Sequence, residues 1–489
     1  MPLLQAAAPM RMARPRARGT MSEQAPPAGD SGSDRTPAEG DHSLRRVMGP
    51  GLLLLFIVGD VLGTGIYALT GKVANHVGGA VWLPFLVAFV VATLTAMSYL
   101  ELVTKYPRAA GAALYTHRAF GVHFLTFVVA FAVMSSGITS ASTASRAFAA
   151  NLSEAFGLGL EGGVGLTLVG LAFMGGLAVI NYRGVGESVK LNVLLTCVEL
   201  TGLLIIIFIG LWAIGLGQGD VSRVLEFKSG DEGGAVWAVI AGTTLAFFAM
   251  VGFEDSVNMA EETKEPSRIF PKVLLTGLTL TGIVYVLVSI AAITLVAPEE
   301  LGEGEAPLLK VVSAGAPGFP LEVFGFITMF AVANSALINM LMASRLVYGM
   351  SREHVLPPLF GRVHAQRRTP YLAIALTTLL AFGLITFVGE VPALGGTTAL
   401  LLLAVFAIVN VAVLVLRKDA VDHEHFRAPP LVPLLGTLSC AFLVGPWTGR
   451  DPVQYLIAAI LLGIGVGLWL LTWLYDRKAG RTAKGSVPQ

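Results

Sequence analysis

Twelve stretches of this sequence are each long and apolar enough to cross a lipid bilayer, and this feature constrains the fold more than any other. A spanning helix needs about 20 mostly apolar residues. Only 13% of the residues are charged, whereas soluble domains are about 25% charged, so we expect an all-α, multi-pass membrane protein. The candidate spans are residues 48–70, 78–103, 121–149, 164–181, 190–216, 233–258, 270–296, 318–349, 369–388, 395–417, 430–447 and 453–475.

The two ends of the chain are polar. Residues 1–45 have no apolar run, and their Pro, Ala, Gly, Ser and Arg content predicts a disordered tail, with either Met1 or Met21 as the start. Residues 476–489 form a second tail. Most of the 33 Lys and Arg fall on the same side as both tails, which predicts that both termini are cytoplasmic in the cell (inner) membrane. A net charge of +1 gives no reason to expect a nucleic acid partner.

The first span contains a candidate helix break at Gly63-Thr64-Gly65. Gly disfavours a helix by about 1 kcal/mol relative to Ala. Unpaired peptide groups are tolerated in a membrane only where protein or a wet cavity supplies partners. The alternative is close helix packing at small residues.

The sixth span contains a second candidate break. Gly252 is followed at once by Glu254 and Asp255. A charge at the centre of a span costs roughly 2.5–3.5 kcal/mol on insertion scales, so such a residue normally faces a functional interior. Interrupted helices at corresponding places in two halves are typical of the binding site of a secondary transporter.

Four motifs at these spans carry a resemblance to a known family. They are GTGIY (63–67), SYLELVTKYPRAAGAALYTHRAFG (98–121), GFEDSVNMAEETKEPSRIFP (252–271) and SREHVLPPLFGRVHAQRRTP (351–370). With them, the chain resembles the amino acid–polyamine–organocation (APC) permease superfamily.

The resemblance implies a transporter domain over residues 46–475, with discontinuous helices 1 and 6. A five-plus-five inverted repeat would pair residues 48–216 with residues 233–417, and two extra helices would occupy residues 430–475. It also implies alternating access for amino acids or related amines, and no cofactor.

Similarity to the arginine/agmatine antiporters of this family implies where a substrate binds. The positive end of the half-helix near Thr64 suits a carboxylate. The carboxylate contacts would be Thr64 and Gly65, after Gly63, and the ammonium contacts would be backbone carbonyls beside Gly252. The substrate side chain would face span 3 and span 8, although for the two serines we prefer a packing role. The carbonyls belong to Val61, Phe248 and Val251, and the side-chain contacts would be Ser136, Ser140 and Asn339.

Three carboxylates within the spans are candidates for ion coupling. Glu254 aligns with the proton-sensing glutamate of those antiporters, and removal from water disfavours a charged carboxylate. Asp60 lies about one helical turn before Gly63 and should border the same cavity. Glu199 replaces a Lys of several sodium-independent relatives. It is either protonated in coupling or a cation ligand, and a hydrogen bond to a broken helix is the alternative for Glu199 and Asp60.

These features predict an importer of a cationic or zwitterionic amino acid, coupled to protons rather than sodium. Alternatives in the same fold are an amino acid/amine exchanger and a polyamine permease, and a more distant one is a non-transporting sensor. The eight histidines are scattered, and we find no metal cluster and no nucleophile paired with a base, so an enzyme is not expected.

Overall fold

The computed structural model describes residues 48–107, 111–160, 163–184, 189–228, 234–260 and 263–478, and nearly all of its regular structure is helical. A helix pairs its own backbone N–H and C=O groups by hydrogen bonds. Lipid offers no partners for these groups, so the apolar stretches of this chain must be helical to cross a bilayer. The predicted tail at residues 1–45 and most of the tail at 476–489 lie outside the described residues.

Ten helical segments of the described chain are long and apolar enough to cross a membrane, which confirms the prediction of an all-α, multi-pass membrane protein. Two shorter apolar helices, α13 (Tyr371–Phe387) and α15 (Leu431–Val444), occupy the ninth and eleventh predicted spans. The ten are α1–α2 (Pro50–Val61 and Thr64–Val77), α3 (Trp82–Lys105), α5 (His123–Ala155), α6 (Val164–Arg183), α7 (Val189–Gly215), α8 (Gly234–Ala246) with η2 (Phe247–Met250) and η3 (Asp255–Met259), α9 (Pro266–Leu295), α12 (Leu321–Arg352), α14 (Val391–Leu416) and α16 (Pro452–Lys478).

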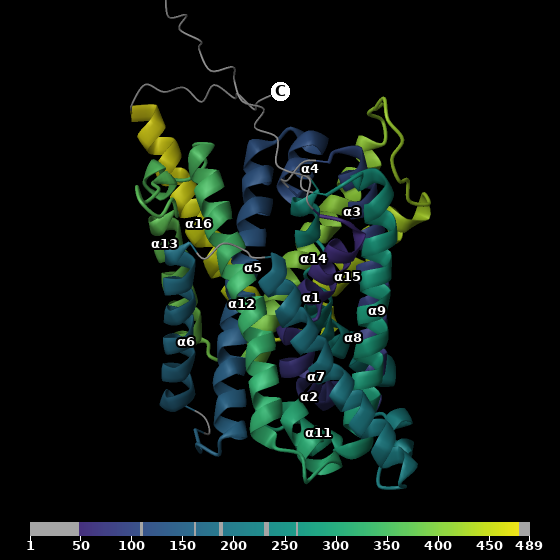
Figure 1. Cartoon of the computed structure of the whole chain (residues 1–489). Helices are drawn as coiled ribbons and strands as arrows, with labels where there is room; N and C mark the ends of the chain where they lie inside the picture. The colour runs from purple at the N-terminus through teal and green to yellow at the C-terminus, as the bar shows by residue number, and fades with distance from the viewer. Residues whose placement is uncertain are drawn as a thin grey trace, which may run out of the picture. The chain divides into compact units, whose positions relative to one another are not determined.

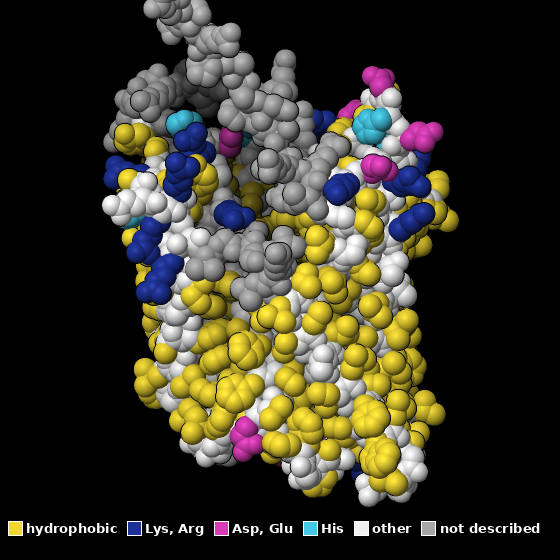
Figure 2. All heavy atoms as spheres, in the orientation of Figure 1, with side chains coloured by type: hydrophobic (Ala, Val, Ile, Leu, Met, Phe, Trp, Pro, Cys, Tyr) yellow, Lys and Arg dark blue, Asp and Glu magenta, His cyan; other side chains and the backbone are white. Residues whose placement is uncertain are grey.

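Short helices connect the long ones at both ends of the bundle. In Figure 1, α4 (Gly111–Phe120) lies at the upper end and α11 (Pro307–Gly315) at the lower end. Figure 2 shows dark blue Lys and Arg side chains gathered toward the upper end, with hydrophobic side chains over the flanks below them. The remaining connecting helices are η1 (Val221–Leu225), α10 (Pro298–Gly302), η4 (Pro358–Gly361) and η5 (Pro446–Thr448).

Helix α5 packs along α12 and also contacts α14 and α2. The face of α5 is rich in small residues, and a Cβ on Gly137 would lie 3.3 Å from the backbone oxygen of Asn339 on α12. Small residues let membrane helices approach closely where the hydrophobic effect gives no drive for association. Helices α1 and α2 lie among α5, α7, α8, α9 and α12, so the first break is deep inside the bundle.

A buried ion pair joins the last turn of α3 to the chain after α14. The Arg417 guanidinium donates to both oxygens of Glu101, at 2.8 and 2.7 Å. The Ala428 amide donates to the same carboxylate at 2.9 Å, and the Ala428 carbonyl accepts from Arg417 at 2.7 Å. The Glu101 side chain is only 3% exposed. The hydrogen bonds replace those that its carboxylate would make with water and so offset the cost of burying the charge. We call Glu101, Arg417 and Ala428 the α3–α14 clamp.

We predict that replacing either charged member of the α3–α14 clamp destabilises the protein strongly. Leaving one buried charge without its partner costs about 3–5 kcal/mol, so Glu101→Leu and Arg417→Leu should each lower the melting temperature in detergent. The double variant should recover part of that loss. The control is Arg268→Gln, which breaks a pair with Glu265 whose side chains are both more than 70% exposed. Equal effects of control and clamp variants would contradict the prediction.

Candidate functional site

The first break separates α1 from α2. Helix α1 ends at Val61, where the Leu62 amide still donates to the Val58 carbonyl at 2.8 Å, and α2 begins at Thr64. Gly63 between them has φ −39° and ψ −157°, a conformation that is neither helical nor extended. The first N–H groups of α2 therefore have no acceptor within their own helix. The Thr64 hydroxyl is buried and has no hydrogen-bond partner among the described residues.

The second break lies at Gly252, as predicted, and irregular or 3₁₀ structure extends on both sides of it. Helix α8 ends at Ala246, six residues before Gly252, and one 3₁₀ turn follows it. The chain is irregular from Val251 to Glu254 and then resumes as a second 3₁₀ turn, η3, rather than as an α-helix. Gly252 has φ +125°, a conformation that L side chains rarely adopt, which explains a glycine at this position.

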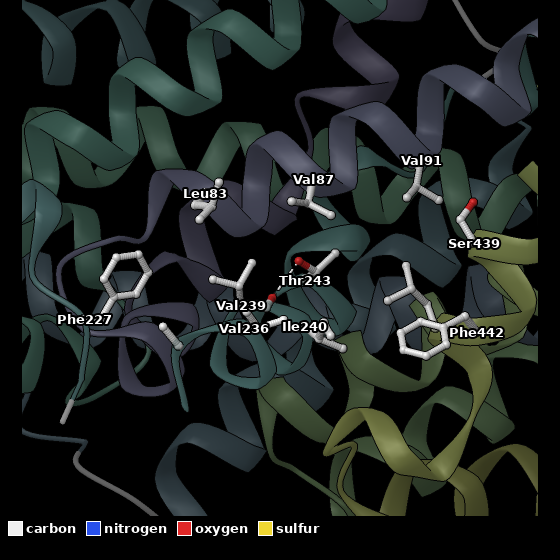
Figure 3. A pocket seen from close by; sticks show the side chains of 12 residues that line it. Leu83, Val87, Val91, Phe227, Val236, Val239, Ile240, Thr243, Ser439 and Phe442 are labelled. Carbon is white, nitrogen blue, oxygen red and sulfur yellow. Dashed lines mark hydrogen bonds between the residues drawn. The ribbon is translucent and has the colours of Figure 1, made fainter. Parts of the chain in front are cut away.

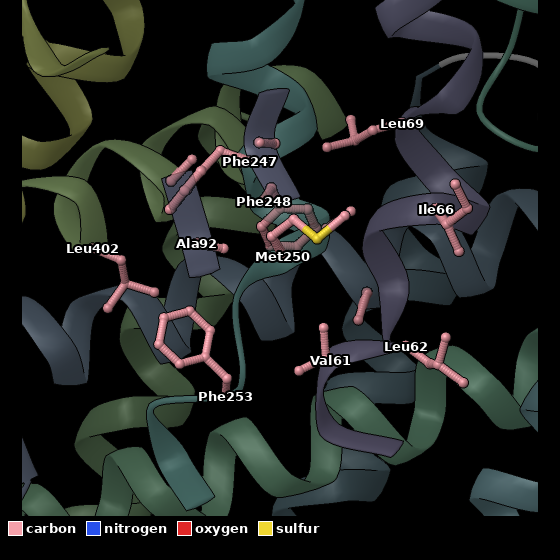
Figure 4. Close-up of a cluster of buried hydrophobic side chains, with 14 of the residues drawn as sticks. Val61, Leu62, Ile66, Leu69, Ala92, Phe247, Phe248, Met250, Phe253 and Leu402 are labelled. Carbon is pink, nitrogen blue, oxygen red and sulfur yellow. The ribbon is translucent and has the colours of Figure 1, made fainter. Parts of the chain in front are cut away.

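The two breaks touch each other. A Cβ on Gly65 would lie 2.4 Å from Cα of Ala249, and a Cβ on Gly252 would lie 2.6 Å from the carbonyl oxygen of Asp60. Figure 4 shows side chains of both breaks, including Val61, Leu62, Phe248 and Met250, in one cluster of buried hydrophobic residues. Backbone from two segments almost 200 residues apart therefore meets at close range inside the bundle.

Two neighbours of the first break were missed by the sequence analysis. The Tyr285 hydroxyl of α9 donates to the Val61 carbonyl at 2.5 Å. Ser335 of α12 faces Gly63, where an added Cβ would lie 2.9 Å from its hydroxyl oxygen. Ser335 is one helical turn before Asn339. The side-chain amide of Asn339 donates to the Ser335 backbone carbonyl at 2.9 Å. That i, i+4 spacing is the signal that identifies Ser335.

Glu254 is held against the second break. Its carboxylate accepts a hydrogen bond from the Gly252 amide at 2.9 Å, and the residue is 7% exposed. The predicted neighbour Asp60 is also buried, and its backbone borders Gly252. The carboxyl group of Glu254 is thus linked directly to the backbone of the second break.

Glu199 lies on α7 beside the first break. The Tyr67 hydroxyl, on the first turn of α2, donates to the Glu199 backbone carbonyl at 2.8 Å. Both carboxylate oxygens of Glu199 are buried and have no hydrogen-bond partner in the described part of the chain. Helix α7 approaches α1 closely here, because a Cβ on Gly59 would overlap the Thr196 side chain.

Ser136 and Ser140, the two serines predicted to contact the substrate, lie on α5. The Ser136 hydroxyl donates to the Val133 carbonyl at 2.7 Å, and its own carbonyl accepts from Thr398 of α14 at 3.4 Å. Ser140 is 5% exposed. The contacts of Ser136 are those of a helix-packing residue, whereas Asn339 is linked to the first break through Ser335.

The end of the bundle that carries α10 and α11 is closed by polar contacts. Lys72 of α2 donates to the Gly302 carbonyl of α10 at 2.8 Å. Arg146 of α5 lies 3.5 Å from the Glu305 carboxylate. Burial raises the pKa of Glu305, and the nearby Arg146 opposes that shift. These contacts join α2 to α10 and α5 to the loop before α11.

Two apolar hollows lie away from the breaks. The one in Figure 3, about 410 Å³, lies between α3, α8 and α15, and Thr243 and Ser439 are its only polar lining side chains. An apolar hollow gives no partners to a charged carboxylate or ammonium. The second hollow, between α6 and α13, also contains no residue of either break. Among the described residues, no group of three His, Cys, Asp or Glu is arranged to hold a metal.

Known proteins match between 71% and 90% of the chain. The branched-chain amino acid permease BcaP of Bacillus subtilis is 26% identical over 459 residues, which cover 90% of this chain and 95% of the relative. The methylthioribose transporter of the same organism is 28% identical over 462 residues, with 89% and 94% covered. Cationic amino acid transporter 9, chloroplastic, of Arabidopsis thaliana is 29% identical over 367 residues, with 71% of this chain and 62% of the relative covered.

The names of these relatives are those of permeases and transporters, not of enzymes. A family model described as amino acid permease matches residues 52–469. Because this match extends from the first span to the last, the chain belongs to the amino acid permease family of the APC superfamily.

Proposed function

We propose that the protein is a secondary active transporter that imports a cationic or zwitterionic amino acid by alternating access, coupled to protons. The contact between the two helix breaks is the observation that carries this proposal. Irregular backbone in a membrane protein offers N–H and C=O groups that no helix uses, and these groups suit the two charges of an amino acid. Membership of the amino acid permease family supports the same conclusion.

The proposed architecture has twelve spans, with α13 and α15 crossing the membrane beside the ten longer helices. The first five spans and the next five form an inverted repeat, and α15 and α16 lie outside it. Two observations support the repeat: the first span of each half is broken, and the third spans, α5 and α12, have 33 and 32 residues. The Arg-rich end in Figure 2 is cytoplasmic in this proposal, as are both termini, in the cell membrane.

In the proposed site, the substrate carboxylate accepts hydrogen bonds from the N–H groups of Thr64 and Gly65. The ammonium donates to the carbonyls of Val61, Phe248 and Val251. Tyr285 already donates to the Val61 carbonyl, but a carbonyl oxygen has two lone pairs and accepts both.

The outer parts of the proposed site surround the substrate's side chain. Gly252 allows the close approach of the Asp60 backbone, and Gly63 leaves room for the Ser335 side chain. Asn339 faces the substrate's side chain, with Ser335 behind it. Ser136 and Ser140 stay as more distant contacts along α5.

Glu254 is the proposed proton site, with Glu199 and Asp60 as further coupling residues. When Glu254 is ionised, its carboxylate accepts from the Gly252 amide. Protonation weakens that charge-assisted hydrogen bond, which loosens the second break. The proton state and the backbone that binds substrate are thereby coupled.

The substrate and the direction of transport are tested together. The named substrates of the relatives differ, so purified protein is first screened by thermal shift against amino acids, polyamines, small amines and methylthioribose. The best ligand is then offered to proteoliposomes with an empty lumen. An importer accumulates it when the outside is acidic. Uptake that begins only after the lumen is loaded with a second substrate would establish an exchanger and contradict this proposal.

We predict that Gly65→Ala and Gly252→Ala each reduce transport at least tenfold. Each new methyl would lie within 2.6 Å of backbone from the other break, and Gly252 also has positive φ, so the breaks must separate. Initial rates of uptake, normalised to monodisperse protein, measure the effect. The matched control is Gly467→Ala on α16, where an added Cβ meets nothing within 4 Å. Normal transport by both break variants would refute the role given to the breaks.

We predict that Glu254→Gln abolishes the response of uptake to an imposed pH step but retains substrate exchange across the membrane. The amide oxygen of Gln still accepts from Gly252, so the backbone geometry is kept while the titrating group is lost. Glu322→Gln, at an exposed carboxylate on the first turn of α12, is the control. If wild type and Glu254→Gln respond alike to the pH step, Glu254 is not the proton site.

We predict equal uptake in sodium and in choline buffers, because Glu199 acts in the proton cycle and holds no cation. Glu199→Gln should then slow uptake in both buffers to the same extent. A sodium requirement in wild type that Glu199→Gln removes would instead make this carboxylate a sodium ligand.

A further inference from the structure

A groove on the flank of the bundle runs between α6 and α13 and has a volume of about 550 Å³. Small residues, Ala178 on α6 and Ala375 on α13, leave room between the two helices. Val179 and Leu379 on its walls are 49% and 68% exposed, so the groove opens onto the face that meets lipid.

The length of the groove matches one leaflet. Its lining on α13 extends from Tyr371 to Phe382, which is roughly 16 Å along a helix. The hydrocarbon core of a bilayer is about 30 Å thick, so a single leaflet is about half of that. Tyr182 and Tyr371 stand together at one end of the groove, since α6 ends at Arg183 and α13 begins at Tyr371. Paired tyrosines are typical of the level of the headgroups.

Arginines stand beyond these tyrosines. The Arg367 guanidinium lies over the Tyr182 ring, 4.8 Å from its centroid. The loop that carries Arg367 is fixed to α6, because the Thr369 hydroxyl donates to the Tyr182 carbonyl at 3.0 Å. His364 packs edge-on against both tyrosine rings, and its Nδ1 accepts from the Arg367 amide at 3.3 Å.

Among the described residues, no carboxylate forms a salt bridge with the arginines at this end. Arg183, Arg367 and Arg368 are all exposed, and no salt bridge within the described residues includes any of them. The flank formed by α6 and α13 in Figure 1 carries dark blue side chains at its upper part in Figure 2, directly above hydrophobic ones. By contrast, no arginine or lysine lines the hollow of Figure 3.

We propose that the α6–α13 groove binds an anionic phospholipid, with one acyl chain between the helices and the phosphate on Arg367 and Arg368. Basic clusters beside membrane helices attract anionic headgroups, whereas an apolar groove alone does not distinguish one phospholipid from another. The tyrosines mark the boundary between the two parts of the site. This inference is independent of the transport mechanism proposed above.

Native mass spectrometry of the full-length protein tests this site. Dioleoyl-phosphatidylglycerol and dioleoyl-phosphatidylcholine, which share their acyl chains, are added separately to delipidated protein. We expect one phosphatidylglycerol to bind more tightly than phosphatidylcholine. Each arginine near a headgroup is worth a preference of about fivefold, so Arg367→Gln with Arg368→Gln should reduce that preference on the order of twentyfold. Ala375→Trp, which fills the groove, should weaken both lipids.

The controls use the same substitutions elsewhere. Arg477→Gln removes an exposed arginine that also stacks on an aromatic ring, 5.2 Å from the centroid of Trp473. Ala235→Trp places tryptophan at an exposed alanine lining the hollow of Figure 3. Neither should change the preference. The proposal is overturned if the two lipids bind equally or if the control variants act like the groove variants. It is also overturned if a second copy of the protein occupies the groove, which would appear as a dimer that Ala375→Trp dissociates.

Discussion

Every peptide group buried in a bilayer needs a partner, and this requirement determines both the regular and the irregular parts of the protein. It makes the described spans helical, since a helix pairs its own N–H and C=O groups. It also confines unwound backbone to places where protein surrounds it. The two breaks lie against each other inside the bundle, and Gly65 and Gly252 permit that approach because they have no side chain to separate the chains. The backbone site that we propose therefore lies where a membrane protein can unwind.

The contacts around the breaks connect them to both ends of the bundle. At the α10 end, Lys72 on α2 donates to Gly302, so the half-helix that begins at the first break is also part of the closure. At the Arg-rich end, the α3–α14 clamp fixes helices beside the breaks through a buried pair. Glu254 connects to the second break through the Gly252 amide. A change at any of these contacts reaches the breaks through one helix or one hydrogen bond, and this supports the alternating access that we propose.

The positions of ten spans and of both breaks were predictable from sequence, because hydropathy and glycines next to mid-span charges depend only on local composition. The length of the second break was not, since the 3₁₀ turns at Phe247–Met250 and Asp255–Met259 depend on packing against the first break. Tyr285 was missed because a tyrosine in an apolar span gives no sign of which distant carbonyl its hydroxyl meets. For Ser136 we preferred a helix-packing role, because its neighbours on the same helix are small. In the structure its backbone carbonyl accepts a hydrogen bond from Thr398 of the adjacent helix α14.

The central claim is that backbone groups of the two breaks bind the substrate, and an electron cryomicroscopy map of the protein with its best-binding amino acid tests it most directly. The account predicts density between the breaks, with the carboxylate in hydrogen-bond reach of the Thr64 and Gly65 amides and the ammonium facing the carbonyls of the second break. Density held by side-chain carboxylates alone, or located in one of the apolar hollows while the breaks stay in contact, would contradict it.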